Sequence, residues 1–420
     1  MLPVVRKPGK TSNRDGIWTL AINGLLVFLL CCWSPTRARG SDFRWLPEIN
    51  FRGEYDDNVT FDSKNETSDY IGICSPKVTF SYLTERASID GTLGADLIRY
   101  WDETELNTEH QRYQVNGSHQ ITEKTALNAS AGYIKDTTLE SELRETGLVN
   151  YRENRHRYNL GGGSTYQLNE LTSLEINYIY SKTNYRGDEY DDYDSHTIVG
   201  QLNRQLNNQR DVITLQPYYA YYDSSASTVD NYGFQLGWHH LYSETLDFTL
   251  FGGARYTHTE YKYWTYRQVP APYPFPVYTL VRETEKDGNW GGVVDFTLHQ
   301  TGELWDSSIE YSHDLSYGSN GQVLNHDRFT ARTSYKITSR FRVAMRATLS
   351  RSKSEKDFGY NEENSRYYDL EPSLRYRLGR QHYLNFGYRY AHVYDKTLSD
   401  HQKYDRNRVW LSLTFRFPQQ

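Results

Sequence analysis

Arginines recur on the polar side of the last strand-like segments of this chain, where their spacing could create a site for anions. Adjacent strands would place them side by side, as a basic ladder along one sector of a sheet. Each guanidinium group offers a rigid fork of donors, which suits anionic or hydroxyl-rich solutes. The alternative is structural: the arginines pair with carboxylates such as Glu310 and Glu371 and satisfy a wet interior. The predicted ladder comprises Arg342, Arg346, Arg375, Arg377, Arg389, Arg408 and Arg416.

A second charged cluster has the opposite sign and lies in a segment without strand-like alternation. Carboxylates this dense could hold divalent cations that bridge to lipid headgroups or polysaccharide, since hard cations prefer several oxygen ligands. The spacing is not that of an EF-hand, and a solvated acidic loop is the favoured interpretation. We therefore expect no metal site and no cofactor. The acidic residues are Asp188, Glu189, Asp191, Asp192 and Asp194.

Motifs of the common enzyme classes are absent from the sequence. It contains no Gly-x-Ser-x-Gly, no His-Glu-x-x-His and no Walker loop. His239 and His240 are adjacent, so in a strand they would face opposite sides and could not bind one metal ion together. We expect no catalytic residues and no enzymatic activity, although barrel hydrolases are recognised by geometry and not by such motifs.

The segments that must position these charges alternate with a period of two, which is typical of strands. The C-terminal segment shows it most clearly. Its apolar side holds Val409, Leu411, Leu413, Phe415 and Phe417, and its polar side holds Arg408, Trp410, Ser412, Thr414 and Arg416. One apolar face and one arginine-bearing face fit a wall with lipid outside and water inside.

Short polar turns recur between these alternating segments. In a barrel with short periplasmic turns and longer outer loops, two strands and one outer loop would fill each interval between such turns. Eight turns, with one strand left at each end, imply an all-β, antiparallel up-and-down transmembrane β-barrel of about 18 strands, with a range of roughly 16 to 20. The turns lie at residues 84–86, 122–125, 169–172, 207–209, 243–245, 300–302, 338–340 and 379–381.

The longer connections are expected to be outer loops. The loop that contains residues 269–276 has four prolines and two aromatic residues, and favours polyproline II. It could fold in as a constriction or offer its rings to a sugar chain, but a plain exposed loop is favoured. The expected outer loops are residues 56–69, 138–153, 187–194, 263–286, 353–364 and 395–405.

The N-terminus has the three parts of a secretory signal: basic residues, an apolar run from Ile17 to Trp33, and a small-residue site before Ser41. We expect a signal peptide at 1–40 and one outer-membrane barrel at 41–420; a retained anchor is less favoured because the run is short for a span. Beyond residue 40 the chain has 41 Lys and Arg against 52 Asp and Glu, which argues against nucleic acid as a partner. Cys74 is then the one remaining cysteine.

From Asn50 onward the chain resembles a group of Gram-negative outer-membrane barrels encoded beside exopolysaccharide and exosortase systems, often called β-barrel porin-like proteins. The stretches that carry the resemblance are YDDNV at 55–59, SDYI at 68–71 leading to Ser75 and Pro76, and YIKDTTLESE at 133–142. The resemblance implies a barrel that helps to move or anchor surface polysaccharide, and it brings no catalytic residues.

These features lead us to expect a bacterial outer-membrane protein that is exported through the inner membrane. Its expected function is a porin-like channel for exopolysaccharide export or surface sugar traffic. Two alternatives stay open: a plugged structural or adhesive barrel that binds polysaccharide, and the porin sheath of a cytochrome electron conduit. The expected partners are outer-membrane lipid and lipopolysaccharide, the barrel assembly machinery, and polysaccharide or periplasmic export proteins, but not nucleic acid.

Overall fold

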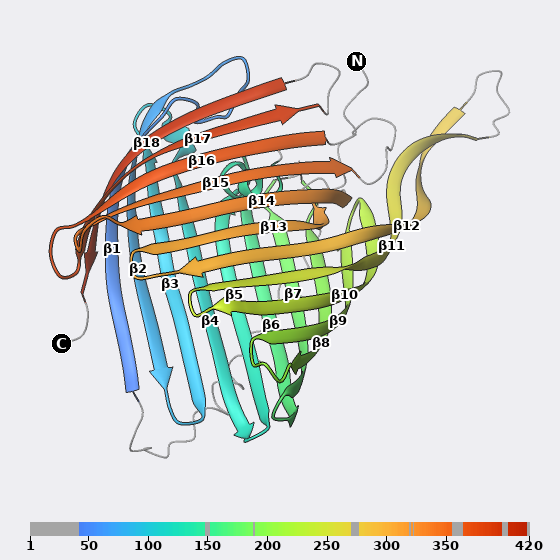
Figure 1. The fold of residues 1–420 in the computed structure, drawn as a ribbon. Coiled ribbons are helices and arrows are strands. Elements are labelled where there is room, and N and C mark those ends of the chain that lie inside the picture. Colours follow the sequence, from blue (N-terminus) through green and yellow to red (C-terminus); the bar gives the residue numbers. More distant parts are fainter. Residues whose placement is uncertain are drawn as a thin grey trace.

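The computed structural model describes residues 42–147, 152–187, 190–269, 277–318, 321, 323–354, 364–396 and 402–417. These residues form a closed barrel of 18 antiparallel strands with a short helix inside it (Figure 1). The predicted all-β barrel of about 18 strands is therefore confirmed. The predicted signal peptide at 1–40 lies outside the described residues. No helix in the described ranges has the length and apolar character needed to cross a membrane.

The first nine strands are β1 Asp42–Asp56, β2 Asp69–Leu83, β3 Ala87–Tyr100, β4 Thr108–Thr122, β5 Thr125–Thr137, β6 Asn154–Asn169, β7 Thr172–Tyr185, β8 Tyr193–Gln205 and β9 Asp211–Ser224. The other nine are β10 Ser227–Ser243, β11 Leu246–Val269, β12 Val277–Thr301, β13 Trp305–Tyr317, β14 Val323–Lys336, β15 Phe341–Ser354, β16 Asn364–Arg377, β17 His382–Asp395 and β18 Gln402–Arg416. Two short helices lie in the connections: η1 Thr104–Leu106 and α2 Thr138–Thr146.

Each strand pairs with the next one along the chain, and β18 returns to β1 to close the barrel. The closing register places Glu48 opposite Arg416 and Asp56 opposite Arg408. All eight predicted polar turns join consecutive strands, from β2–β3 to β16–β17. We call their side of the barrel the short-turn end and the opposite side the loop end. In outer-membrane barrels short turns are periplasmic, so the short-turn end corresponds to the periplasm.

The two faces of the wall differ in polarity, as the alternation predicts. On β18, Val409 and Leu411 are 40% and 52% exposed on the outer face, whereas Ser412 and Thr414 on the inner face are 5% and 8% exposed. The outer face carries further exposed Leu, Ile, Phe, Tyr and Trp side chains around the barrel. An apolar surface of this extent is stable only against lipid, because water would penalise it.

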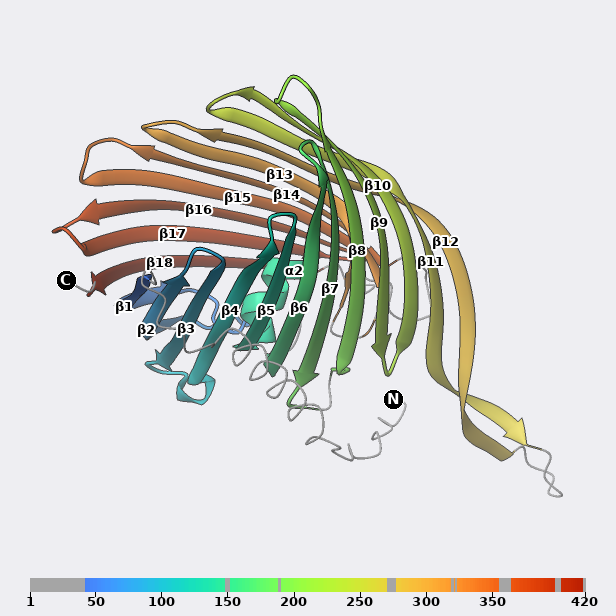
Figure 2. The same ribbon diagram turned by 90° about the horizontal axis from the view of Figure 1, so that it is seen from below.

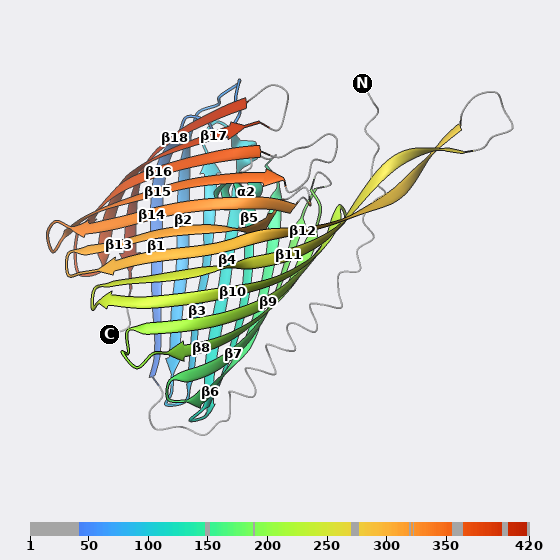
Figure 3. The same cartoon turned by 45° about the vertical axis from the view of Figure 1, so that its right-hand side comes forward.

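The connection between β11 and β12 differs from its predicted form. Residues 263–286 are expected to be an outer loop, but β11 and β12 continue into this segment and pair as far as Val269 and Val277. β10 leaves β11 at Tyr261, and β12 joins β13 only from Val294 onward, so the hairpin stands off the wall as a two-stranded ribbon (Figures 1 and 3). Its tyrosines, threonines and tryptophan favour strand structure. The proline-rich residues 270–276 lie outside the described residues.

The loop-side ends of β13 and β14 pack against β9 and β10 where the ribbon leaves the wall. The ring of Tyr317 stacks on Tyr222 with the centroids 4.0 Å apart, and Val229 and Val323 complete a buried cluster. The Ser227 hydroxyl also donates a hydrogen bond to the carbonyl oxygen of Gly321, 2.6 Å away. These contacts tie the β9–β10 turn to the β13–β14 connection.

Because the two faces of the wall differ, we predict that an arginine lowers the stability of the barrel by different amounts at two neighbouring residues of β16. Leu374 faces outward and is 38% exposed, whereas Ser373 faces the lumen between Ala344 and Gly387. Leu374→Arg should destabilise the barrel by about 2–4 kcal/mol, because its charge would enter lipid. Ser373→Arg should cost much less, because its charge can reach the wet lumen. Urea unfolding in lipid vesicles measures both variants, and equal losses would contradict the assignment.

Candidate functional site in the lumen

The predicted ladder arginines occupy the inward phase of four adjacent strands, opposite the apolar phase that faces outward. Cross-strand registers place Arg342 opposite Arg375 and Arg389 opposite Arg408. Like charges directly opposite each other are unfavourable, so carboxylates or water must compensate them. By strand, the ladder is Arg342 and Arg346 on β15, Arg375 and Arg377 on β16, Arg389 on β17, and Arg408 and Arg416 on β18.

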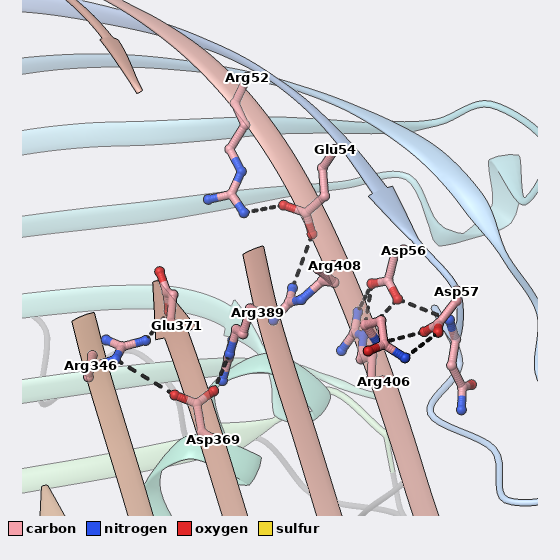
Figure 4. Close-up of polar contacts among 12 residues, drawn as sticks. Arg52, Glu54, Asp56, Asp57, Arg346, Asp369, Glu371, Arg389, Arg406 and Arg408 are labelled. Atoms are coloured by element: carbon pink, nitrogen blue, oxygen red, sulfur yellow. Dashed lines mark hydrogen bonds and ion pairs between the residues drawn. The ribbon is translucent and has the colours of Figure 1, made fainter. Parts of the chain in front are cut away.

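Asp369 is the centre of one compensating network in the loop-side half of the barrel (Figure 4). Its carboxylate forms an ion pair with Arg389 and lies 3.7 Å from Arg346, which also pairs with Glu371. Arg389 donates a second hydrogen bond to the hydroxyl of Tyr367, 2.7 Å away. The side chains of Asp369 and Arg389 are only 2% and 4% exposed, so this pair is shielded from water.

A second network lies at the seam between β18 and β1 (Figure 4). The Nε of Arg406 donates to both carboxylate oxygens of Asp56, at 2.8 and 3.0 Å, and both side chains are at most 2% exposed. Glu54 pairs with Arg408 at 3.3 Å and also with Arg52. Arg406 and Arg52 are not in the predicted ladder. The sequence could have indicated them, because both lie on the polar side of the alternation in β18 and β1.

The short-turn half of the ladder has fewer acidic partners. Arg416 donates to Glu48 at 2.6 Å, and Lys77 donates to the same carboxylate at 2.8 Å. Three arginines of the ladder have no carboxylate partner among the described residues, and we call them the short-turn arginines. They are Arg342, Arg375 and Arg377. Arg375 contacts neutral groups: its Nε donates to the Asn385 side-chain oxygen at 2.8 Å, and its guanidinium group lies over the ring of Tyr383.

Helix α2 lies inside the barrel and reaches from β5 to the arginine-bearing wall (Figure 2). Its two leucines are each 3% exposed and pack in a cluster with the inward side chains of β16 and β17. That cluster contains Phe61, Leu139, Leu143, Tyr367, Ala391 and Val393. Because six other strands separate β5 from β16 around the ring, the helix bridges across the lumen and narrows its loop-side half.

The C-terminus of α2 is fixed to the wall by its last carbonyl groups. The Ser352 hydroxyl donates to the carbonyl oxygen of Thr146, and the Ser365 hydroxyl donates to that of Gly147, 2.6 Å away. Gly147 has a φ of 74°, and a Cβ there would lie 2.9 Å from the Cβ of Tyr367. The left-handed cap and the close approach to the wall therefore both favour glycine.

Two further arginines tie the helix to the neighbouring strands β5 and β6. Arg155 and Arg157 of β6 both pair with Asp136, at 3.1 and 2.5 Å, and with Glu145 of α2, at 3.3 and 2.7 Å. Arg155 is 2% exposed, so its charge depends on these carboxylates. Neither arginine belongs to the predicted ladder, because both lie across the lumen from it.

The connection between β1 and β2 also turns inward at the loop end. The ring of Phe61 stacks on Tyr404 with the centroids 5.6 Å apart, and the Asn58 amide donates to the carbonyl oxygens of Asp62 and Asp405. The backbone N–H groups of Asn65 and Lys64 donate to the Asp62 carboxylate at 3.0 and 2.8 Å, and they lower its pKa below the ordinary value. This connection and α2 together cover the buried ion pairs.

The described part of the predicted acidic cluster does not converge on one point. Asp192 accepts the backbone N–H of Tyr185 at 2.8 Å, whereas Asp194 lies on the outer face of β8, 3.3 Å from His196. Asp191 belongs to the β7–β8 connection, and Asp188 and Glu189 lie outside the described residues. Within the described ranges, no group of three or more His, Cys, Asp or Glu residues is arranged to hold a metal ion.

Comparisons with known proteins give one partial family match and several structural neighbours. Residues 38–216 match the family described as "Putative beta-barrel porin 2", and no curated protein matches the chain in sequence. Pseudomonas aeruginosa OccK2 (OpdF) gives a TM-score of 0.46 at 10% identity, over 90% of this chain and 98% of that one. Acinetobacter baumannii OccAB3 gives 0.42 at 12%, over 90% and 100%. The Escherichia coli K12 receptor Fiu gives 0.45 at 8%, over 90% and 82%.

The family match over residues 38–216 and the apolar outer face of the closed barrel both fit a porin-like outer-membrane β-barrel. The predicted resemblance to porin-like barrels is confirmed at this level. Its association with exopolysaccharide systems stays a prediction, as do the export of the chain through a signal peptide and the roles of the ladder and the acidic loop.

Because Arg389 and Asp369 form a buried ion pair, we predict that removing the arginine lowers stability strongly and that a second substitution restores part of the loss. Arg389→Gln should destabilise the barrel by about 3–5 kcal/mol, because Asp369 would lose its shielded partner. The double variant Arg389→Gln with Asp369→Asn should recover part of this loss, since no unpaired charge remains. Arg366→Gln, on the exposed outer face of β16, is the matched control and should have little effect. Equal unfolding free energies for Arg389→Gln and Arg366→Gln would contradict the assigned pairing.

Proposed function

We propose that the barrel is a passive channel for anionic, hydroxyl-rich solutes, and that it serves exopolysaccharide export or surface sugar traffic. The observation that carries this proposal is the group of short-turn arginines, Arg342, Arg375 and Arg377. They line one wall of the lumen without a carboxylate partner among the described residues, and Arg375 and Arg377 are exposed. Their donors are therefore available to a solute.

The charges in the two halves of the lumen suggest different roles. In the loop-side half, carboxylates neutralise the arginines, and these pairs stabilise the wall beneath α2. On the β15–β16 wall of the short-turn half, the arginines have no acidic partner among the described residues, so the local potential along this wall is positive although the chain as a whole is acidic. A narrow, low-dielectric lumen strengthens such a potential relative to bulk water. Anions should therefore enter from the short-turn end more readily than cations.

The class of solute follows from the guanidinium donors of the short-turn arginines and from the width of the lumen beside α2. Guanidinium groups bind carboxylate and sulfate or phosphate oxygens through two parallel hydrogen bonds, and they also donate to hydroxyl groups. Because α2 narrows the loop-side half, the arrangement favours slender solutes, such as single acidic sugars or one extended sugar chain. This proposal involves no bond-making step by the protein, in keeping with the channel character of a porin-like barrel.

A second candidate function is an adhesive barrel with a closed lumen, and the β11–β12 ribbon favours it. One face of the ribbon presents three aromatic rings, Trp264, Tyr266 and Tyr278, which are 60%, 59% and 57% exposed. Exposed rings in a row can stack on sugars, and Arg282 opposite Trp264 adds a cation to the same face. In this reading α2 is a permanent plug and the ribbon binds polysaccharide.

Ion selectivity in a planar bilayer distinguishes the two functions. In the channel, the triple variant Arg342→Gln, Arg375→Gln and Arg377→Gln should move the reversal potential of a salt gradient toward cation selectivity. The acidic residues at the mouth would oppose the wild-type anion preference, but they are wetter and more strongly screened by salt. The replaced side chains have no acidic partner in the described residues, so the variant should still fold.

Arg366→Gln is the control, because it removes a charge from the outer face of the same strand and should leave the reversal potential unchanged. No shift in a triple variant that still conducts would make the short-turn arginines structural. No conductance in the wild-type protein would favour the adhesive barrel over the channel.

A further inference from the structure

A basic pocket lies on the outer surface of the barrel, away from the lumen, at the loop end of β3 to β6. Its cavity of about 450 Å³ is lined by three cationic side chains, one carboxylate and three neutral polar residues. The cations are Arg99, Lys135 and Arg186, and the other lining residues are Asn107, Thr108, Glu109 and Asn154. This concentration of positive charge is unusual for an acidic chain.

The strand registers place two of these cations on the lipid-facing side of the wall. Arg99 shares its phase on β3 with Leu97 and Leu93, which are 38% and 44% exposed on the outer face. Lys135 shares its phase on β5 with Tyr133 and stands opposite Gln111. Neither side chain therefore points toward the lumen.

A row of tyrosines next to the pocket, on its short-turn side, indicates where the pocket lies across the thickness of the membrane. Tyr113, Tyr133 and Tyr158 lie side by side on the outer faces of β4, β5 and β6, with ring centroids 5.7 and 5.2 Å apart. Such rings mark the level at which hydrocarbon gives way to headgroups. Lys135 follows Tyr133 by two residues toward the loop end, a rise of about 7 Å, so its ammonium group lies at the level of lipid headgroups.

Most of the positive charge in the pocket is not neutralised by the protein. Arg99 donates to the carbonyl oxygens of Ile98 and Thr108 and makes a long, exposed contact of 3.4 Å with Glu109. Exposed ion pairs of this kind contribute little to stability. Among the described residues, Lys135 and Arg186 have no carboxylate partner within ion-pair distance. Three cations thus face one weakly engaged carboxylate.

We propose that this pocket binds the phosphate groups of an anionic lipid in the outer leaflet of the membrane. A soluble anion could use the same donors, but the position favours a lipid: the pocket opens on the outer face, directly above an aromatic row that contacts the membrane boundary. Asn107, Thr108 and Asn154 add neutral hydrogen-bonding groups suited to the sugar or glycerol that carries the phosphate. The site is independent of the channel and would anchor and orient the barrel.

Native mass spectrometry of the purified full-length barrel tests the proposal, with bisphosphorylated lipid A as the probe. The double variant Lys135→Gln with Arg186→Gln should weaken lipid A binding about tenfold or more, because it removes two of the three cations that would attract the lipid phosphates. The matched control is Arg351→Gln with Arg366→Gln. These two exposed arginines stand opposite each other on the outer face of β15 and β16, and they do not line the pocket.

The result expected is a loss in the pocket variant only, with little binding of dephosphorylated lipid A and no competition by millimolar inorganic phosphate. Equal losses in both double variants would overturn the proposal, since binding would then follow total charge. Effective competition by inorganic phosphate would also overturn it, because the pocket would be a site for a soluble anion. Retained heat-modifiable migration in gels shows that both variants are folded.

Discussion

The lumen of this barrel is governed by one constraint: a polar side chain that faces inward must find a partner or reach water. The outer face of the closed sheet has to be apolar, so the charges of the chain are directed inward or toward the rims. Where α2 and the β1–β2 connection cover the wall, each buried arginine has a carboxylate, as in the pairs of Arg389 with Asp369 and Arg406 with Asp56. Where the lumen is open to solvent, Arg375 and Arg377 have none among the described residues.

The inward connections and the ion pairs therefore depend on each other. Leu139 and Leu143 of α2 remove water from the wall, and the dry wall then requires its charges to be paired. In return, Arg155 and Arg157 hold the helix by Glu145, and two serines of β15 and β16 satisfy its last carbonyl groups. A change in the position of α2 would expose charges that are stable only when covered. The position of α2 and the pairing of the wall charges are therefore coupled.

The strand count could be predicted from the sequence because turn chemistry and alternation are local signals. The partners of the arginines could not, since the register of β18 on β1 joins residues some 350 positions apart, such as Arg406 and Asp56. Helix α2 had local signals that the strand pattern outweighed: Thr137 and Glu140 in capping-box spacing, leucines four apart, and Gly147 at the end. The ribbon was missed because aromatic and β-branched residues extend β11 and β12 through a segment that reads as a polar loop.

Accessibility of the lumen wall to a charged thiol reagent tests the division of the lumen most directly. In a Cys74→Ser background, Ser373→Cys places a thiol in the short-turn half, and Ser350→Cys places one beside Gly147 under the helix. The first should react quickly and the second much more slowly, and Leu139→Asn with Leu143→Asn should speed the second by releasing α2. Equal reaction rates at the two positions, with α2 intact, would contradict the division of the lumen into a covered, charge-paired half and an open half with a cationic wall.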